Sequence, residues 1–382
     1  PYTTLFRSLH RIGADDHRAP PQGGVVPLLD GCVESIHVDM KNDPCNIHFL
    51  TRGHPSMVRP RYSRTGPSGL NYCRPDWGFL VPYLIMIKSK KTAVLFFVAI
   101  FLVTSLMLMA DDNKLRIIVF GAHPDDPELV GVTMMKFVQA GHKVRMVSMT
   151  NGNAGHFREG GGPLAWRRYQ ETRCSSAISG VEYIVMDNDD GKLMPTLENR
   201  NLVIAQIREF KADIVISHRP NDYHPDHRNT GLLVRDAAYM VTVPNIVPSV
   251  PHLRKNPLFM YMYDRFTIPN PFDPEIVVDI SDAYDKKVNM YDCHESQMYE
   301  WIPYNEMKLD QVPADKVARK AWLAKDWESF FRGPVDAYRD RLVELYGADR
   351  AAKVTAVEAF QVSEYGWKPD METLKKMFPF FP

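Results

Sequence analysis

The sequence lacks an excess of charge of either sign. Its 382 residues carry 46 Lys and Arg against 46 Asp and Glu, so the formal net charge is zero with neutral histidines. A balanced chain without a compact basic patch of interleaved aromatics has no field that would attract phosphate backbones. We therefore do not expect nucleic acid among its partners.

Cysteines are also few, and their spacing does not suit a metal cluster. Cys32, Cys45 and Cys73 precede a long apolar run, and Cys174 and Cys293 follow it. The last two have no CxxC spacing and no neighbouring ligand pattern. We expect them to be buried free thiols, with one disulfide between them as the alternative in an oxidising compartment.

One long apolar run is present, and it divides the chain. Residues 92–110 read TAVLFFVAIFLVTSLMLMA, with Lys88, Lys90 and Lys91 just before them. A basic stretch, an apolar stretch and a small final residue are the parts of a secretory signal peptide, which we expect over 86–110. An uncleaved membrane anchor is the alternative, because a run of this length can span a bilayer. The protein is therefore expected to be periplasmic or secreted, or held at the membrane by this segment alone.

Residues 1–85 are expected to be non-native or a disordered extension, because a signal peptide must be N-terminal. They are rich in Pro, Arg, Gly and His and show no sustained helical or alternating apolar period. Met86 is then the expected start of the protein. Residues 111–382 would form one folded domain with an elaborated C-terminal third.

After the apolar run, short β-branched segments alternate with longer amphipathic ones. Strands are predicted over 115–121, 143–150, 181–187 and 212–218, and helices over about 127–140, 164–179, 197–210 and from about 226. Strict alternation predicts an α/β fold, a Rossmann-like open sheet that is mostly parallel, with helices on both faces. Later elements are strands over 258–264 and 275–280, helices over about 282–298 and 314–347, and an edge strand over 357–362.

Polar clusters follow the first and fourth predicted strands, GAHPDDPEL (121–129) and HRPNDYHPDH (218–227). In an open parallel sheet the ligand site lies beyond the carboxyl ends of the strands, where the strand order reverses. With a strand order of 3-2-1-4-5 the first and fourth strands are neighbours there, so both clusters would face one crevice. They would bring together ligands suited to zinc or another first-row divalent ion, namely His123, Asp125, Asp126, His224, Asp226 and His227.

Either cluster alone would be a weak indication, since Asp226, for example, could simply cap a helix. Consecutive side chains point in different directions, so Asp125 and Asp126 are not expected to bind one metal together. One can coordinate while the other handles a proton. His224 and His227, three residues apart at a helix start, can share a face while doing different work. The joint occurrence of the clusters after two adjacent strands favours a metal site.

The motif pair AHPDD and HPDH resembles that of the PIG-L/LmbE-like N-acetylglucosaminyl deacetylase family. The resemblance covers Leu115 to about Ser296, nearly half of the chain. Softer agreement is found in Arg168 with Glu171, in Asp190 with Gly191, and in VVDIS…K…HESQ around 277–297. Pro127 departs from the family pattern, but proline is acceptable in the first turn of a helix.

The resemblance implies how the work is divided. The implied ligands of a Zn²⁺ ion are His123, Asp126 and His227, which leave one position for water. Asp125 would be the general base as metal-bound water attacks the amide carbonyl. His224 would stabilise the oxyanion or protonate the leaving amine, with Asp226 holding its ring in the useful tautomer.

Four residues are expected to bind the substrate. The resemblance assigns sugar hydroxyls to Arg168 and Asp190, with Asp189 as an alternative to the latter. Arg219 and Asn221 are added because they precede the HPDH turn and would line the crevice.

The expected function is zinc-dependent removal of the N-acetyl group from an N-acetylglucosamine-type amino sugar or glycoside. The partner would be a small molecule or glycan that bears such a sugar. Two histidines and a carboxylate also suit Fe²⁺ or another divalent ion, and the same site could hydrolyse another amide or an ester. A third hypothesis is a non-catalytic carbohydrate-binding protein with a vestigial site, against which the six intact polar residues argue.

Overall fold

The computed structural model describes residues 114–382 together with three short strands earlier in the chain. Those strands, β1 (Val25–Val26), β2 (Ser35–Val38) and β3 (Ile47–Leu50), form an antiparallel sheet in the order β1-β2-β3. The segment 86–110, predicted as signal or anchor, lies outside the described residues. Within the described part of the chain, no helix combines the length and apolar character needed to cross a membrane.

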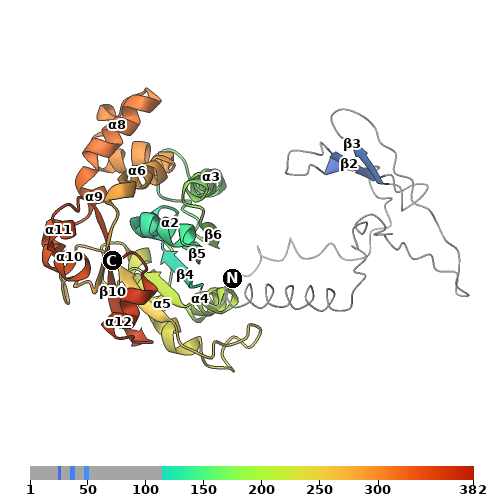
Figure 1. Ribbon diagram of the computed structural model, residues 1–382. Coiled ribbons are helices and arrows are strands. Elements are labelled where there is room, and N and C mark those ends of the chain that lie inside the picture. The colour runs from blue at the N-terminus through green and yellow to red at the C-terminus, as the bar shows by residue number, and fades with distance from the viewer. Residues whose placement is uncertain (1–24, 27–34, 39–46, 51–113) are drawn as a thin grey trace, which may run out of the picture. The chain divides into compact units, whose positions relative to one another are not determined.

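The domain is built on a seven-stranded sheet with the order β6-β5-β4-β7-β8-β10-β9. Figure 1 labels β4, β5, β6 and β10 among these strands. The strands are β4 (Arg116–Gly121), β5 (Lys143–Thr150), β6 (Glu182–Asn188), β7 (Ile214–Ser217), β8 (Leu258–Met262), β9 (Ile276–Asp279) and β10 (Val357–Gly366). The strands β6, β5, β4, β7 and β8 pair in parallel, and β10 is antiparallel to both of its neighbours. The predicted order 3-2-1-4-5 of the first five strands and the mostly parallel α/β sheet are confirmed.

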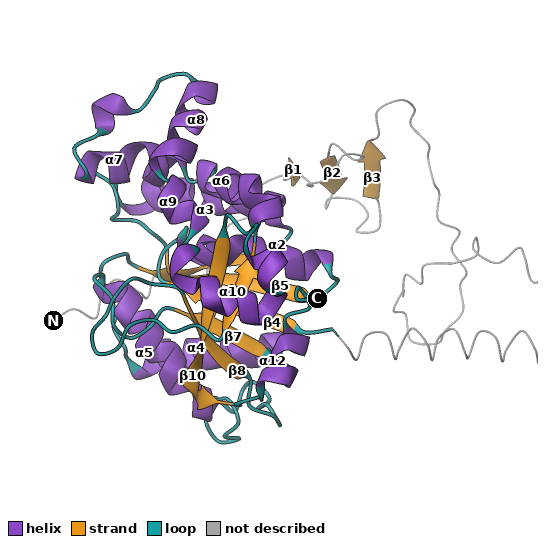
Figure 2. Cartoon of the chain, turned by 60° about the vertical axis from the view of Figure 1, so that its left-hand side comes forward, coloured by secondary structure: helices purple, strands orange, loops and turns teal. Residues whose placement is uncertain are grey.

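Both faces of the sheet are covered. Along β4, Ile117 and Val119 belong to one buried apolar core, and Ile118 and Phe120 belong to another. Such a continuous apolar run suits a parallel strand that is buried on two sides. Figure 2 shows α2, α3 and α6 on one face and α4 and α5 on the other. These helices are α2 (Gly131–Gln139), α3 (Gly161–Ser179), α4 (Leu197–Phe210), α5 (Pro225–Met240) and α6 (Tyr284–Asp292).

The remaining helices are shorter than the sequence predicts. They are α7 (Ile302–Asn305), α8 (Lys316–Asp326), α9 (Glu328–Arg332), α10 (Arg339–Tyr346), α11 (Ala348–Ala351), α12 (Met371–Met377), the π-helix η3 (Ser296–Trp301) and the 3-10 helices η1 (Asp126–Val130), η2 (Ser281–Ala283), η4 (Leu309–Gln311) and η5 (Asp336–Tyr338). The helical stretch predicted over about 314–347 is present but is divided into α8, α9, η5 and α10. Gly333, at φ 67°, ends α9, and Pro334 follows it directly.

β10 corrects a second prediction. The sequence places 357–362 at an edge of the sheet, but β10 lies between β8 and β9, and Phe360 pairs with both Met262 and Ile276. The edge strand is β9 instead. The first four residues of β10 are buried, as a strand with partners on both sides requires.

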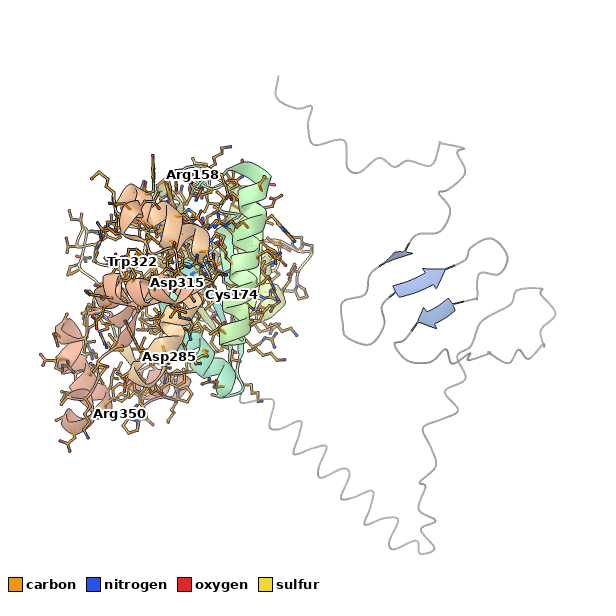
Figure 3. The ribbon with its side chains drawn as sticks, turned by 90° about the horizontal axis from the view of Figure 1, so that it is seen from above. Arg158, Cys174, Asp285, Asp315, Trp322 and Arg350 are labelled. Carbon is orange, nitrogen blue, oxygen red and sulfur yellow. A yellow bond between two sulfur atoms is a disulfide. The ribbon has the colours of Figure 1, made fainter. Side chains whose placement is uncertain are left out.

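Cys174 and Cys293 form a disulfide, with their Cα atoms 5.7 Å apart. The prediction of free thiols is therefore wrong, and the alternative, a disulfide between Cys174 and Cys293, is confirmed. Cys174 lies on the side of α3 that faces the C-terminal helices (Figure 3). Because the two cysteines are separated by 119 residues, the bond ties α3 to the C-terminal third of the chain.

Candidate active site

The carboxyl ends of β4 and β7 lie side by side, and Phe120 pairs with Ser217 near those ends. The AHPDD turn leads from β4 into η1, and the HRPNDYHPDH turn leads from β7 into α5. This is the point at which the strand order reverses. The side chains of the two motifs meet there, as a ligand site of an open sheet requires.

Three potential ligand atoms form a nearly equilateral triangle. The Nδ1 atom of His123 lies 3.2 Å from Nε2 of His227 and 3.3 Å from Oδ2 of Asp126. That same oxygen lies 3.4 Å from Nε2 of His227. Ligands of a tetrahedral zinc ion, each about 2.0–2.1 Å from the metal, stand about 3.4 Å from one another. The donor set and its spacing thus fit three of the four positions around zinc.

The second nitrogen of each of these imidazoles faces carboxylates. Nε2 of His123 lies 3.2 Å from Oδ1 of Asp190 and 3.3 Å from Oδ2 of Asp226. Nδ1 of His227 lies 3.1 Å from Oδ1 of Asp222. A carboxylate that accepts from one ring nitrogen fixes the tautomer and leaves the lone pair of the other nitrogen for a metal. Both rings are therefore held with their free nitrogens toward Asp126.

The carboxylate of Asp126 is held in its ionised form. Its Oδ2 atom accepts hydrogen bonds from the backbone amides of Ala122 (2.9 Å) and His123 (2.7 Å). Burial alone would raise the pKa of Asp126, but the imidazoles of His227 and His218 hold that pKa well below its usual range. His218 contributes directly, because its Nε2 lies 3.3 Å from Oδ2 of Asp126. An ionised carboxylate is the form that a metal ligand needs.

Asp125 occupies a backbone conformation that favours glycine, with φ 154° and ψ −23°. Such a conformation costs about 1–3 kcal/mol and persists only when its surroundings impose it. One surrounding contact is Nη2 of Arg168, 3.1 Å from Oδ1 of Asp125. Burial raises the pKa of Asp125 to about 6, while Arg168 opposes the shift and Asp126 adds to it. A carboxylate with such a pKa suits a general base near neutral pH.

Arg168 is only 2% exposed and bridges two carboxylates of the site. Besides contacting Asp125 it donates to the carbonyl of Pro124 (2.9 Å), and its Nη1 lies 3.7 Å from Oδ2 of Asp190. Gly152 leaves room for it, since a Cβ there would lie 2.6 Å from Nη1. Asp190 rather than the alternative Asp189 contacts His123.

His224 stands at the N-terminus of α5, with its ring edge-on to that of His123 at 4.6 Å. Burial and the nearby imidazoles of His123 and His227 lower its pKa. Its Nδ1 accepts from the backbone amide of Asp226 (3.2 Å). The amide of Asp226 therefore orients the ring, where the sequence predicts the carboxylate.

The carboxylate of Asp226 is turned the other way, toward the loop after β6. It is fully buried and accepts from the amides of Gly191 (2.7 Å) and Leu193 (3.3 Å), besides facing His123. The backbone amides of Gly191 and Leu193 need hydrogen-bond acceptors inside the protein, and the carboxylate of Asp226, in the first turn of α5, supplies them. Asp226 thus fixes a candidate ligand and the loop that carries Asp190.

Arg219 and Asn221, predicted to bind substrate, use their donors within the protein. Arg219 donates to both oxygens of Asp264, with Nε 2.6 Å from Oδ2, and to two backbone carbonyls in the segment 264–270. Asn221 donates to a third carbonyl of that segment. Their roles as substrate ligands stay predictions, and the observed role of both side chains is to hold the segment 264–270. The sequence placed both residues in the turn before HPDH but did not reveal the segment 264–270 as their partner.

Several residues that hold the site were not predicted from the sequence. Asp222 orients His227, and His218 stacks on the ring of His227 at 4.2 Å. Their only sequence cue was position in the turn before HPDH. Glu128 pairs with His294 at 2.9 Å, and both side chains are fully buried. That pair joins elements too distant in the sequence for any spacing argument.

Comparisons with known proteins match the part of the chain that contains both motifs. The family model for PIG-L, GlcNAc-PI de-N-acetylase, matches residues 118–238. The diacetylchitobiose deacetylase of Thermococcus kodakarensis is 32% identical over 207 residues, which cover 50% of this chain and 74% of that protein. The matched family segment contains both motifs.

Two solved structures share the fold. The N,N'-diacetylchitobiose deacetylase of Pyrococcus horikoshii superposes with a TM-score of 0.51 at 23% identity, covering 65% of this chain and 83% of its own. The 4-carboxy-2-hydroxymuconate hydratase of Pseudomonas putida KT2440 does so with a TM-score of 0.51 at 18% identity, covering 67% and 99%. At these identities the likeness extends to the fold alone, and one of the two relatives is not a deacetylase.

Proposed function

The chain belongs to the PIG-L family of deacetylases, and from this premise we propose that it removes the N-acetyl group from an N-acetylglucosamine-type amino sugar or glycoside, with zinc as cofactor. The observation that carries the proposal is the triangle of His123, Asp126 and His227, whose edges measure 3.2–3.4 Å. The substrate class follows from the relative that acts on diacetylchitobiose.

The residues of the triangle would hold the ion, and the rest of the site would handle protons. When bound there, zinc supplies a Lewis acid and lowers the pKa of a water molecule. Asp125 takes a proton from the attacking water, and Arg168 keeps its carboxylate in place. His224, whose ring lies 4.6 Å from that of His123, returns a proton to the nitrogen as the C–N bond breaks. The products are acetate and the free amino sugar.

Carboxylates around the triangle keep this arrangement rigid. Asp190 and Asp226 hold His123, and Asp222 holds His227. Positioning partners of this kind commonly set metal affinity and ligand orientation. The donor set also suits Fe²⁺, so the metal is part of what the experiment must decide.

We also propose that the protein works outside the cytoplasm, as the segment 86–110 suggests. The disulfide between Cys174 and Cys293 supports this, because disulfides persist in oxidising compartments and are rare in the cytosol.

The proposal is tested by acetate release from N-acetylglucosamine and diacetylchitobiose, using protein stripped with a chelator and reloaded with Zn²⁺ or Fe²⁺. We expect release only after reloading, and the more active ion identifies the cofactor. No release from any N-acetylated sugar with either ion would refute the proposed function.

The variant Asp125→Asn separates proton transfer from metal binding. We expect kcat to fall about 10²–10⁴-fold, the usual effect of losing a general base, with bound metal unchanged by elemental analysis. The matched variant Asp126→Asn should instead lose metal. Equal loss of metal in both would show that Asp125 is a ligand and not the base.

A further inference from the structure

A rim of apolar side chains stands beside His224 and His227. Tyr223 is 73% exposed and Ile268 is 75% exposed, and the half-buried ring of Phe266 lies 6.3 Å from that of Tyr223. Exposed apolar side chains that gather beside polar residues are a feature of ligand-binding surfaces.

Tyr223 connects this rim to the site. Its ring stands edge-on to those of His227 at 5.5 Å and His224 at 5.8 Å. Phe266 and Ile268 lie beyond it, in the segment 264–270 that follows β8. A substrate unit that contacts this segment is therefore next to the reacting group but does not itself react.

The segment 264–270 is held in place by the residues that lead from β7 to the HPDH motif. Arg219 grips both oxygens of Asp264 and also donates to the carbonyls of Phe266 (2.6 Å) and Asn270 (2.8 Å). Asn221 donates to the carbonyl of Ile268. The planar guanidinium of Arg219 bonds a carboxylate and two backbone carbonyls of this segment, so the segment is fixed before substrate binds. The rim therefore loses little conformational freedom when a substrate binds to it.

The chemistry of the rim suits a carbohydrate. Aromatic and aliphatic surfaces pack against the apolar face of a pyranose ring, while polar groups at the edge reach its hydroxyls. The exposed residues Arg265 and Thr267 flank Phe266 in the chain and supply such groups.

We propose that Tyr223, Phe266 and Ile268 form a subsite for the sugar unit attached to the reacting N-acetyl sugar, and that Arg219 governs substrate choice by holding that subsite in place. The inference rests on the proposed function and extends it to substrates of at least two sugar units. Arg219 is a positioning residue here, since it acts through the segment 264–270.

The test compares diacetylchitobiose with N-acetylglucosamine as substrates of the full chain loaded with metal. The variants are Phe266→Ala, Ile268→Ala and Arg219→Lys, which keeps the charge but loses the fork. Glu182→Gln is the matched control, because it breaks a bidentate pair with Arg145 at the opposite ends of the strands (3.0 Å for each bond). Metal content and disaccharide binding to the metal-free protein, measured by calorimetry, give readouts that do not depend on turnover.

We expect the three variants to lower kcat/KM for the disaccharide about 5- to 30-fold, mainly through KM, as loss of one packed side chain does. Turnover of the monosaccharide, metal content and the control should stay within about twofold. Calorimetric affinity for the disaccharide should fall in parallel with kcat/KM.

Three outcomes would overturn the inference. Both substrates falling equally would assign the segment to the chemistry itself. No change with either substrate would remove the subsite, and a changed oligomeric mass in Ile268→Ala would assign the rim to a contact between copies of the chain. Each leaves the proposed function standing, whereas a wild-type protein that deacetylates neither sugar would refute the function and with it the subsite.

Discussion

The part of the domain that contains the motifs and the part that follows it contribute different things to the site. Every group of potential metal ligands found among the described residues lies between His123 and His227. The region from β8 onward supplies braces instead. By braces we mean four sets of hydrogen bonds to the earlier part of the domain. His294 bonds to Glu128, Ser296 to Glu171, Glu358 to the amides of Val132 and Thr133, and Asp264 to Arg219.

Two of these braces end close in the chain to a site residue. Glu128 lies two positions after Asp126, and Glu171 lies one helical turn after Arg168. The motifs therefore supply the side chains of the candidate site, while the later region helps to hold those side chains in position. Removing a brace should mainly lower the free energy of unfolding. Altering a residue next to the proposed metal should mainly lower metal affinity.

The largest expected effect is that of His294→Leu, which leaves the buried carboxylate of Glu128 without its partner. Breaking one side of a buried ion pair costs about 3–5 kcal/mol. Urea unfolding of the metal-free protein measures the loss. The double variant Glu128→Met/His294→Leu removes both charges and should recover much of the stability; if it does not, packing rather than charge explains the effect.

The same pair predicts how stability depends on pH. Burial would lower the pKa of His294, but the carboxylate of Glu128 outweighs it and raises that pKa above the value of an exposed histidine. The folded protein therefore binds this proton more tightly than the unfolded chain does. The contribution is complete below about pH 6.5 and is lost as the pH rises through the folded pKa. The stability gap between wild type and His294→Leu should be wider at about pH 6 than at about pH 9.

Removing the disulfide with Cys174→Ser and Cys293→Ser tests the covalent brace. The bond closes a separation of 119 residues, and its loss should destabilise the fold by about 2–5 kcal/mol. Urea unfolding with and without reductant measures this, with the wild type in reductant as the control. An unchanged midpoint would mean that side-chain contacts alone hold α3 to the later region.

The smallest expected effect on stability is that of a change next to the proposed metal ligands. Asp222→Asn removes the charged acceptor from Nδ1 of His227 but keeps a similar shape. Metal affinity should fall about 10- to 100-fold, as measured by competition with a chelator, while unfolding of the metal-free protein stays nearly unchanged. A large loss of stability with intact metal affinity would place Asp222 among the braces.

Much of the fold could be predicted because β4 to β8 alternate with helices in a regular parallel pattern. The order of these five strands and the meeting of AHPDD with HPDH follow from that pattern. The position of β10 could not be predicted, because its partners β8 and β9 are about 80 to 100 residues away and no local pattern selects them.

The meeting of the two motifs could be predicted because it depends on backbone position alone, whereas the hydrogen-bond partners of their side chains could not. His123, Asp126 and His227 meet because their strands are neighbours. The contact of Arg219 with Asp264 could not be predicted, because the sequence does not reveal that the two residues lie opposite each other. Asp226 was assigned to His224 for the same reason, although its carboxylate is used by Gly191 and Leu193.

The backbone of Asp125 carries a consequence for how this protein could evolve. Its φ of 154° is one that glycine adopts freely, so Asp125→Gly would relax the turn while deleting the carboxylate. The exchange would also leave the buried guanidinium of Arg168 without this carboxylate, so the relief of backbone strain is opposed by the loss of a buried ion pair. A homologue with glycine at this position would form the turn without backbone strain but would lack the proposed base. We therefore expect such a homologue to have lost deacetylase activity.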